Sequence, residues 1–199
     1  MQAPITLTII RDEHRALSAM LRSIPLLLAE HRRHGSLPDF GSLRAMLFYV
    51  DEFPERLHHP KESQLLFPKL RARAPMLREC LDELDQDHAR GERAIRELQH
   101  SLLAFEMMGE ARRLRFERQV DSYVDLYLRH MAREESEVLP VALRVLTTED
   151  WADLDEAFGS NRDPLTGHAP AADYQALFQQ VLCSAPAPIG LGPALGSSR

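Results

Sequence analysis

The sequence predicts an all-α protein in which four long helices pack as an antiparallel bundle. Helix formers such as Leu, Ala, Arg and Glu dominate the composition, whereas Val, Ile and Thr are few and Gly contributes only 9 residues. Apolar residues recur at helical spacing through long segments that short loops separate. A length of 199 residues fits one hydrophobic core better than two.

Capping residues and prolines place the first two helical segments. The first helix is expected over 6–33, with a bend at Pro25. Asp39 is suited to be the N-cap of the second segment, which extends to about residue 73. This second segment contains three prolines, so we expect it to be kinked or restarted near residues 58–60.

The third and fourth helices follow after short loops. The third helix is expected over 75–108, because Pro75 suits its first turn and Gly109 suits its end. The fourth helix should cover 110–146 and bend at Pro140.

Beyond the bundle the sequence predicts two short helices and a loose end. Thr147 or Thr148 should cap a helix over 150–158, and acidic residues at its start favour the positive helix N-terminus. A further short helix is expected over 171–182. The predicted units are a bundle over 1–146, short helices packed on it over 147–185, and a flexible tail over 186–199.

Charge and cysteine content exclude several classes of function. The formal net charge of −6 disfavours a protein that binds nucleic acid by neutralising phosphates. Cys80 and Cys183 lie far apart, which suggests neither a disulfide scaffold nor a zinc finger. We find neither a signal peptide nor a membrane span, so the sequence predicts a cytoplasmic protein without a membrane partner. The sequence gives no indication of the oligomeric state.

Nine histidines are unusual in this composition, and some of them fall at inward-facing helix positions. In the third helix His88 takes the place of an apolar residue in a 4-3-4-3 series, and Gly91 leaves room one turn on. In the fourth helix His130 and Glu134 are four residues apart, so both face inward from successive turns.

The second segment repeats this spacing with His58 and Glu62, and the first helix has His14 at the head of its apolar stripe. An unpaired buried charge costs several kcal/mol, on the order of 3–5, so such groups are paired or bind a metal. A single histidine of this kind is more often a satisfied core residue, but one in each of four helices predicts a metal site. Imidazole and carboxylate donors suit iron, manganese or zinc better than copper(I) or calcium.

These motifs closely resemble the hemerythrin-like, HHE cation-binding family, whose members are four-helix bundles that hold a non-haem di-iron centre. The resemblance covers about residues 5–146 and implies an up-down-up-down topology. It also implies two iron ions that are joined by carboxylate and oxo or hydroxo bridges. The stretches that carry the resemblance are Asp12-Glu13-His14, Phe53 to Glu62, Asp87-His88 and His130 to Glu135. By resemblance, His14, His58, His88 and His130 are terminal ligands, and Glu62 and Glu134 bridge the two irons.

One departure concerns the third helix, where the oxygen-carrying members have two histidines one turn apart. Here Leu84 and Glu92 flank His88 at that spacing, so the fifth histidine is missing. His59, which follows His58, is the substitute that we consider as a metal ligand, and the alternative is that it is exposed or lies outside the ligand set. In either case an iron with an open position would take a small ligand such as dioxygen, nitric oxide or peroxide.

The resemblance favours a protein that binds or senses dioxygen or nitric oxide over an enzyme. The alternatives are iron–sulfur cluster repair, a peroxide-linked di-iron redox protein, and an iron store or purely structural bundle. Repair proteins of this family usually carry an extra N-terminal segment with a cysteine pair, which this sequence does not show before Thr6. A ferritin-like oxidase is disfavoured because its sites use Glu-x-x-His with more carboxylates.

Overall fold

The computed structural model describes residues 4–184, and every regular element within this range is helical. Short π-helical and 3-10 turns interrupt or extend the longer helices. The α-helices are α1 (Ile5–Arg33), α2 (Phe40–Val50), α3 (His59–Lys61), α4 (Phe67–Arg73), α5 (Arg78–Met108), α6 (Glu110–Arg133), α7 (Leu139–Val145), α8 (Thr148–Gly159) and α9 (Gln175–Ser184). The π-helical stretches are Asp51–His58, Glu62–Leu66 and Glu134–Val138, and the 3-10 turns are Pro75–Leu77, Pro164–Thr166 and Ala172–Tyr174.

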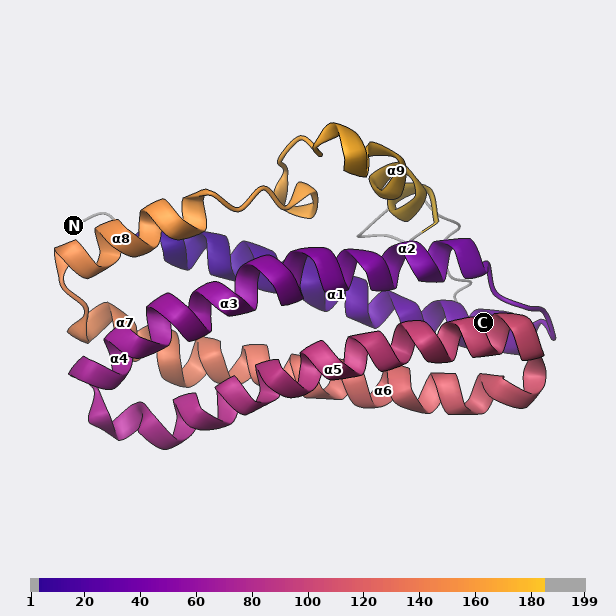
Figure 1. Cartoon of the computed structure of the whole chain (residues 1–199), viewed down its shortest axis with the longest axis horizontal. Coiled ribbons are helices and arrows are strands. Elements are labelled where there is room, and N and C mark those ends of the chain that lie inside the picture. The colour runs from indigo at the N-terminus through magenta and orange to yellow at the C-terminus, as the bar shows by residue number, and fades with distance from the viewer. Residues whose placement is uncertain (1–3, 185–199) are drawn as a thin grey trace, which may run out of the picture.

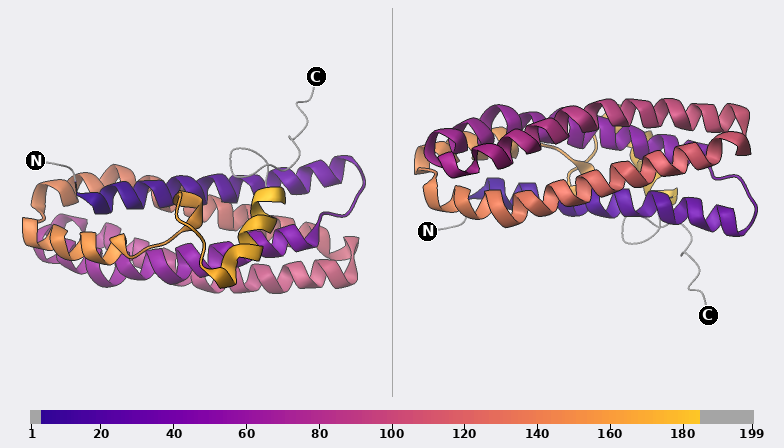
Figure 2. Two further views of the ribbon diagram at one scale, coloured as in Figure 1. Left: turned by 90° about the horizontal axis from the view of Figure 1, so that it is seen from above. Right: turned by 90° about the horizontal axis from the view of Figure 1, so that it is seen from below.

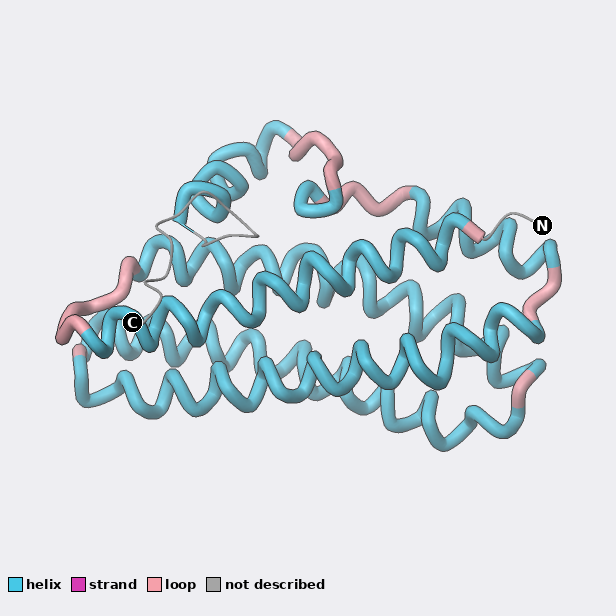
Figure 3. The backbone as a smooth tube through the Cα atoms, turned by 180° about the vertical axis from the view of Figure 1, so that it is seen from behind, coloured by secondary structure: helices cyan, strands magenta, loops and turns pink. Residues whose placement is uncertain are grey.

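Long helical runs lie side by side along the molecule (Figure 1). These runs are α1, the continuous stretch from α2 to α4, α5, and α6 with α7, and successive runs point in opposite directions. α5 packs along α6, α1 packs against α6, and α2 packs against α5. Short loops join the runs at the two ends of the molecule (Figure 3). α8 lies along α1, and α9 lies across α2 (Figure 2).

The helix boundaries confirm most of the sequence predictions. The Asp39 side chain caps α2 by accepting a hydrogen bond from the backbone N–H of Gly41 at 3.0 Å. Gly109 ends α5 with φ +69°, a conformation that favours glycine. α1 continues past Pro25 as one helix. Of the two candidate caps, Thr147 caps α8 through a reciprocal capping box.

The helix expected over 171–182 is present as a 3-10 turn followed by α9. The flexible tail expected over 186–199 lies outside the described residues, and the division of the chain into units stays a prediction.

The kinks expected from proline take the form of wider, π-helical turns. A proline lacks the N–H that would bond the carbonyl four residues earlier, so that carbonyl must find another partner. The carbonyls four residues before Pro60, Pro68 and Pro140 fall within the three π-helical stretches. These stretches hold His58, Glu62 and Glu134 of the predicted site, and π-helical turns are frequent at functional sites.

The apolar core is divided into two clusters that lie on either side of the histidines. One cluster is built mainly from α1, α2, α5, α6 and α9, and it includes Leu17, Ile95 and Met131. The other packs the opposite end of the molecule around Ile10 and Leu84. The predicted site residues therefore form a polar layer between two apolar clusters that limit the access of water.

None of the described helices combines the length and the apolarity that crossing a membrane would require.

Candidate metal centre

All seven predicted site residues are buried within this polar layer. Each of these residues exposes at most 8% of its surface to solvent. They come from α1, from the kinked stretch between α2 and α4, from α5, and from α6 with the π-helical turn after it. The seven residues are His14, His58, His59, Glu62, His88, His130 and Glu134.

The donor atoms of these residues cluster tightly enough to hold a metal. In the range 4–184, three overlapping groups have ligand atoms that lie within 4.8 Å of one another. Imidazole nitrogens and carboxylate oxygens are both good metal donors. The groups are His59 with His88 and His130; Glu62 with His88, His130 and Glu134; and His14 with His58 and Glu62.

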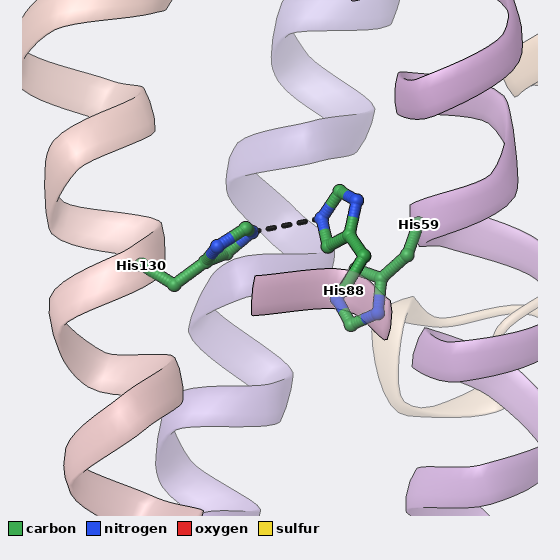
Figure 4. Close-up of side chains that lie close together, drawn as sticks. All are labelled: His59, His88 and His130. Carbon is green, nitrogen blue, oxygen red and sulfur yellow. Dashed lines mark hydrogen bonds between the residues drawn. The ribbon is translucent and has the colours of Figure 1, made fainter. Parts of the chain in front are cut away.

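Four of the histidines form two pairs. The first histidine pair is His14 and His58, whose ring centroids lie 5.1 Å apart. The second histidine pair is His88 and His130, whose Nε2 atoms lie 2.9 Å apart and are joined by the dashed line in Figure 4. Two nitrogens that bind one ion at right angles, each about 2.0–2.1 Å from it, are themselves about 3 Å apart. The spacing of the second pair therefore suits two ligands of one ion.

Each glutamate lies between the two histidine pairs. One carboxylate oxygen of Glu62 is 3.1 Å from Nε2 of His58, and the other is 3.5 Å from Nε2 of His88. Glu134 repeats this arrangement, with its two oxygens 3.3 Å from an Nε2 atom of each pair. Both carboxylates thus present one oxygen to each pair.

The outer ring nitrogen of four of the five histidines lies within hydrogen-bond distance of an acceptor. When Nδ1–H donates outward, the Nε2 lone pair is free to bind a metal, and such partners fix the ring orientation. Nδ1 of His88 lies within hydrogen-bond distance of the Ser63 hydroxyl, and this hydroxyl donates to the carboxylate of Asp85. The Nδ1 partners are Glu135 for His14 at 3.0 Å, Glu13 for His58 at 2.7 Å, Glu55 for His59 at 3.1 Å and Ser63 for His88 at 2.9 Å. The carboxylate of Asp87 lies 3.9 Å from Nδ1 of His130, which is an ion-pair distance and too long for a hydrogen bond.

Buried polar atoms at the centre of this cluster have no hydrogen-bond partner among the described residues. They are Nε2 of His14 and His58 and all four carboxylate oxygens of Glu62 and Glu134. The carboxylate oxygens of Glu62 and Glu134 lie within ion-pair distance of the histidine Nε2 atoms but do not form hydrogen bonds with them. The oxygen and nitrogen atoms therefore surround a common point at which a metal could bind. Unpaired buried carboxylates are costly, and a cation among them would satisfy them all. The residues present therefore fit a metal.

Electrostatic coupling within the cluster is strong. Burial opposes protonation of His130, but the carboxylates of Glu134 and Asp87 outweigh it and raise the pKa of His130 to about 10. Burial likewise opposes ionisation of Glu134, yet His130 and His14 hold its pKa well below the usual range. The carboxylates therefore stabilise positive charge at the centre of the cluster, which is the charge that a metal ion would bring.

His59 lies within the cluster and is buried, so the expectation that it could be exposed is wrong, whereas its role as a ligand stays a prediction. Its ring stacks on His88 at a centroid distance of 4.4 Å and on Tyr127 at 5.0 Å, and Figure 4 shows it beside the second pair. Burial and the neighbouring histidines hold the pKa of His59 well below its usual value. A neutral imidazole is the form that binds metals.

A buried carboxylate that the sequence did not single out lies behind His59. Tyr123 and Tyr127 both donate hydrogen bonds of 2.6 Å to one oxygen of Glu55. Burial raises the pKa of Glu55 to about 7, although both tyrosine hydroxyls act to lower it. By contrast Glu92, which flanks His88 in sequence, is exposed and pairs with Arg96.

Gly91 provides the space that Tyr127 occupies. A Cβ at position 91 would lie 2.5 Å from the Cζ atom of the Tyr127 ring. We expect Gly91→Ala to push Tyr127 away from Glu55 and to lower the free energy of unfolding by about 1–3 kcal/mol. Gly159→Ala is the control, because its Cβ would meet nothing within 4 Å. Chemical denaturation measures the free energy of unfolding of both variants. Equal values for the two would contradict the role of Gly91 in leaving space for the Tyr127 ring.

Comparisons with known proteins agree with this geometry. No curated protein and no solved structure gives a significant match to the chain. The family described as the hemerythrin HHE cation binding domain matches residues 6–142, a range that contains all seven clustered residues. The chain therefore belongs to the hemerythrin HHE cation-binding domain family.

Proposed function

We propose that the chain forms an up-down-up-down four-helix bundle whose core holds two iron ions and binds or senses a small diatomic ligand, dioxygen or nitric oxide. The observation that carries this proposal is the position of Glu62 and Glu134. Each presents one oxygen to each histidine pair and finds no hydrogen-bond partner for either oxygen. A carboxylate placed in this way suits a bridge between two metal ions.

The two histidine pairs supply the remaining ligands in this proposal. His14 and His58 would bind one ion, and His88 and His130 would bind the other. His59 is the proposed fifth histidine, since its ring nitrogen shares a donor group with those of His88 and His130. Imidazole and carboxylate donors without a thiolate suit iron.

Bound iron supplies a redox-active centre with an open position for a small ligand. The chain's own residues determine what reaches that position and in what state. The two apolar clusters limit water at the polar layer, and the outer carboxylates hold the Nδ1 protons of the histidines. These features favour the binding of a small neutral molecule over the entry of charged substrates.

A second candidate, peroxide-linked redox chemistry, is favoured by Glu55. This carboxyl group is buried next to His59 and has a pKa of about 7, so it can hold or release a proton near neutral pH. Binding alone needs no such group, whereas reduction of an oxygen species consumes protons.

The experiment that separates these functions mixes anaerobically reduced, iron-loaded protein with dioxygen and, separately, with nitric oxide, while a stopped-flow instrument records the visible spectrum. Reversible binding predicts a band that disappears when the gas is removed and returns when it is added. Rapid irreversible conversion with dioxygen would favour the redox candidate. No spectral change with either gas would contradict both.

His59→Ala tests the role of the fifth histidine in the same experiment. Loss of this ligand opens a second position, so we expect the dioxygen-dependent band to decay faster than in the unchanged protein. His100→Ala is the matched control, because His100 is exposed and lies outside the cluster. Identical traces for His59→Ala and the control would show that His59 is not a ligand.

A cytoplasmic location of the protein also stays a prediction.

A further inference from the structure

The segment after α8 reaches the candidate metal centre from outside the region that matches the family. The Asn161 amide nitrogen lies 2.9 and 3.1 Å from the two carboxylate oxygens of Glu13. Glu13 in turn accepts the hydrogen bond from Nδ1 of His58 at 2.7 Å. All three side chains are buried. Asn161 therefore contacts a histidine of the first pair through a single intervening carboxylate.

Lys61 sets the orientation of the Asn161 amide. Its ammonium group donates to the Asn161 side-chain oxygen, so the amide nitrogen must face Glu13. The same ammonium donates to the carbonyl of Ala157 at 2.7 Å and to the Ser160 hydroxyl at 2.9 Å. A cation at these last carbonyls of α8 also complements the helix dipole. Hydrogen bonds therefore link His58 to Glu13, Glu13 to Asn161 and Asn161 to Lys61. Lys61 belongs to the same helical stretch as His58, so these contacts close a ring.

Independent contacts hold the segment on both sides of Asn161. Asp155 on α8 accepts hydrogen bonds from the backbone N–H and the hydroxyl of Thr6 at 2.8 and 2.6 Å. Two residues after Asn161, Asp163 accepts a hydrogen bond from the buried Tyr49 hydroxyl at 2.6 Å. Asn161 is thus fixed relative to α1 and α2, and its amide is presented to Glu13 at a defined position.

We propose that Asn161 is a positioning residue for the metal centre, which fixes Glu13 so that His58 presents Nε2 toward Glu62. This proposal rests on the proposed function, in which His58 is a ligand. A carboxylate on a flexible side chain can rotate away from an imidazole, and the two amide contacts prevent this rotation. Partners that orient a metal-binding histidine contribute strongly to metal affinity.

The arrangement is specific to the first histidine pair. In the second pair, Nδ1 of His88 faces Ser63 at 2.9 Å, and the carboxylate of Asp87 lies 3.9 Å from Nδ1 of His130. Asn161 hydrogen-bonds to neither of these partners; its side-chain contacts are with Glu13 and Lys61. Loss of the Asn161 amide should therefore weaken the binding of one of two metal ions and leave the other unchanged.

The test titrates the metal-free full-length chain with ferrous iron under anaerobic conditions and fits the affinity of each equivalent. For Asn161→Leu we expect one equivalent to bind about tenfold more weakly, at the low end of the effect of removing such an orienting partner. Asn161→Asp keeps the shape and an acceptor for Lys61 but loses the donor to Glu13, so it should weaken the same equivalent. If Asn161→Leu does not fold, Asn161→Asp alone provides the test.

Asp153→Ala is the control for a purely structural role. It removes the ion pair between α8 and Lys69, 2.8 Å long, without touching Asn161 or Glu13, so both equivalents should bind as in the unchanged protein. Unaltered affinity in both Asn161 variants, or equal weakening in Asp153→Ala, would overturn the proposal. Absence of metal binding by the unchanged chain would instead contradict the proposed function on which the proposal rests.

Discussion

Removal of the metal will lower the melting temperature of the protein by about 10 °C. Without a cation, the oxygens of Glu62 and Glu134 stay buried and without hydrogen-bond partners. A ligand present at a thousand times its dissociation constant stabilises the folded state by about 4 kcal/mol. At about 2–4 °C per kcal/mol for a chain of this size, that stabilisation corresponds to about 8–16 °C.

The measurement is thermal unfolding of metal-loaded protein, of protein stripped by a chelator, and of stripped protein after metal has been added back. Chelator added to protein that is already stripped controls for a direct effect of the reagent. An unchanged melting temperature after elemental analysis confirms removal would show that the clustered carboxylates need no cation.

His130→Ala will reduce the metal content by at least one ion per chain. His130 takes part in two of the three donor groups and lies 2.9 Å from its partner in the second histidine pair. Its removal also takes away one of the two imidazoles, those of His130 and His14, that stabilise the charge of the buried Glu134. The loss of a metal ligand is therefore accompanied by weaker compensation of a buried carboxylate.

His100→Ala provides the matched comparison for this variant. The same residue type changes in both proteins, but His100 is exposed on α5 and belongs to none of the donor groups. Metal content measured by elemental analysis should stay at the level of the unchanged protein in His100→Ala. A His130→Ala protein that retains its full metal content would contradict the assignment of the second pair.

The helices and the inward-facing residues could be predicted because both depend on local spacing. The 4-3-4-3 series around His88 places Leu84 and Gly91 on the buried face, and the structure confirms this. The same series shows why Glu92 is exposed, since position 91 and not position 92 continues the buried stripe.

The partners of the histidines could be predicted only in part. Glu135 follows directly after Glu134, and Glu13 directly precedes His14, so their proximity to the site has a signal in the sequence. Ser63 and Asn161 have none, because their contacts depend on how α5 and the segment after α8 pack. Prolines predicted a kink near residues 58–60 and a bend at Pro140, but they did not predict that these would take the form of π-helical turns that include His58, Glu62 and Glu134.

We propose that the polar layer holds two iron ions between its histidine pairs, and this can be measured directly. The most direct measurement is elemental analysis of the full-length chain, purified after expression in iron-replete medium and normalised to protein concentration by amino-acid analysis. We predict two irons per chain. A chain that contains no metal, or one zinc per chain, would contradict the claim.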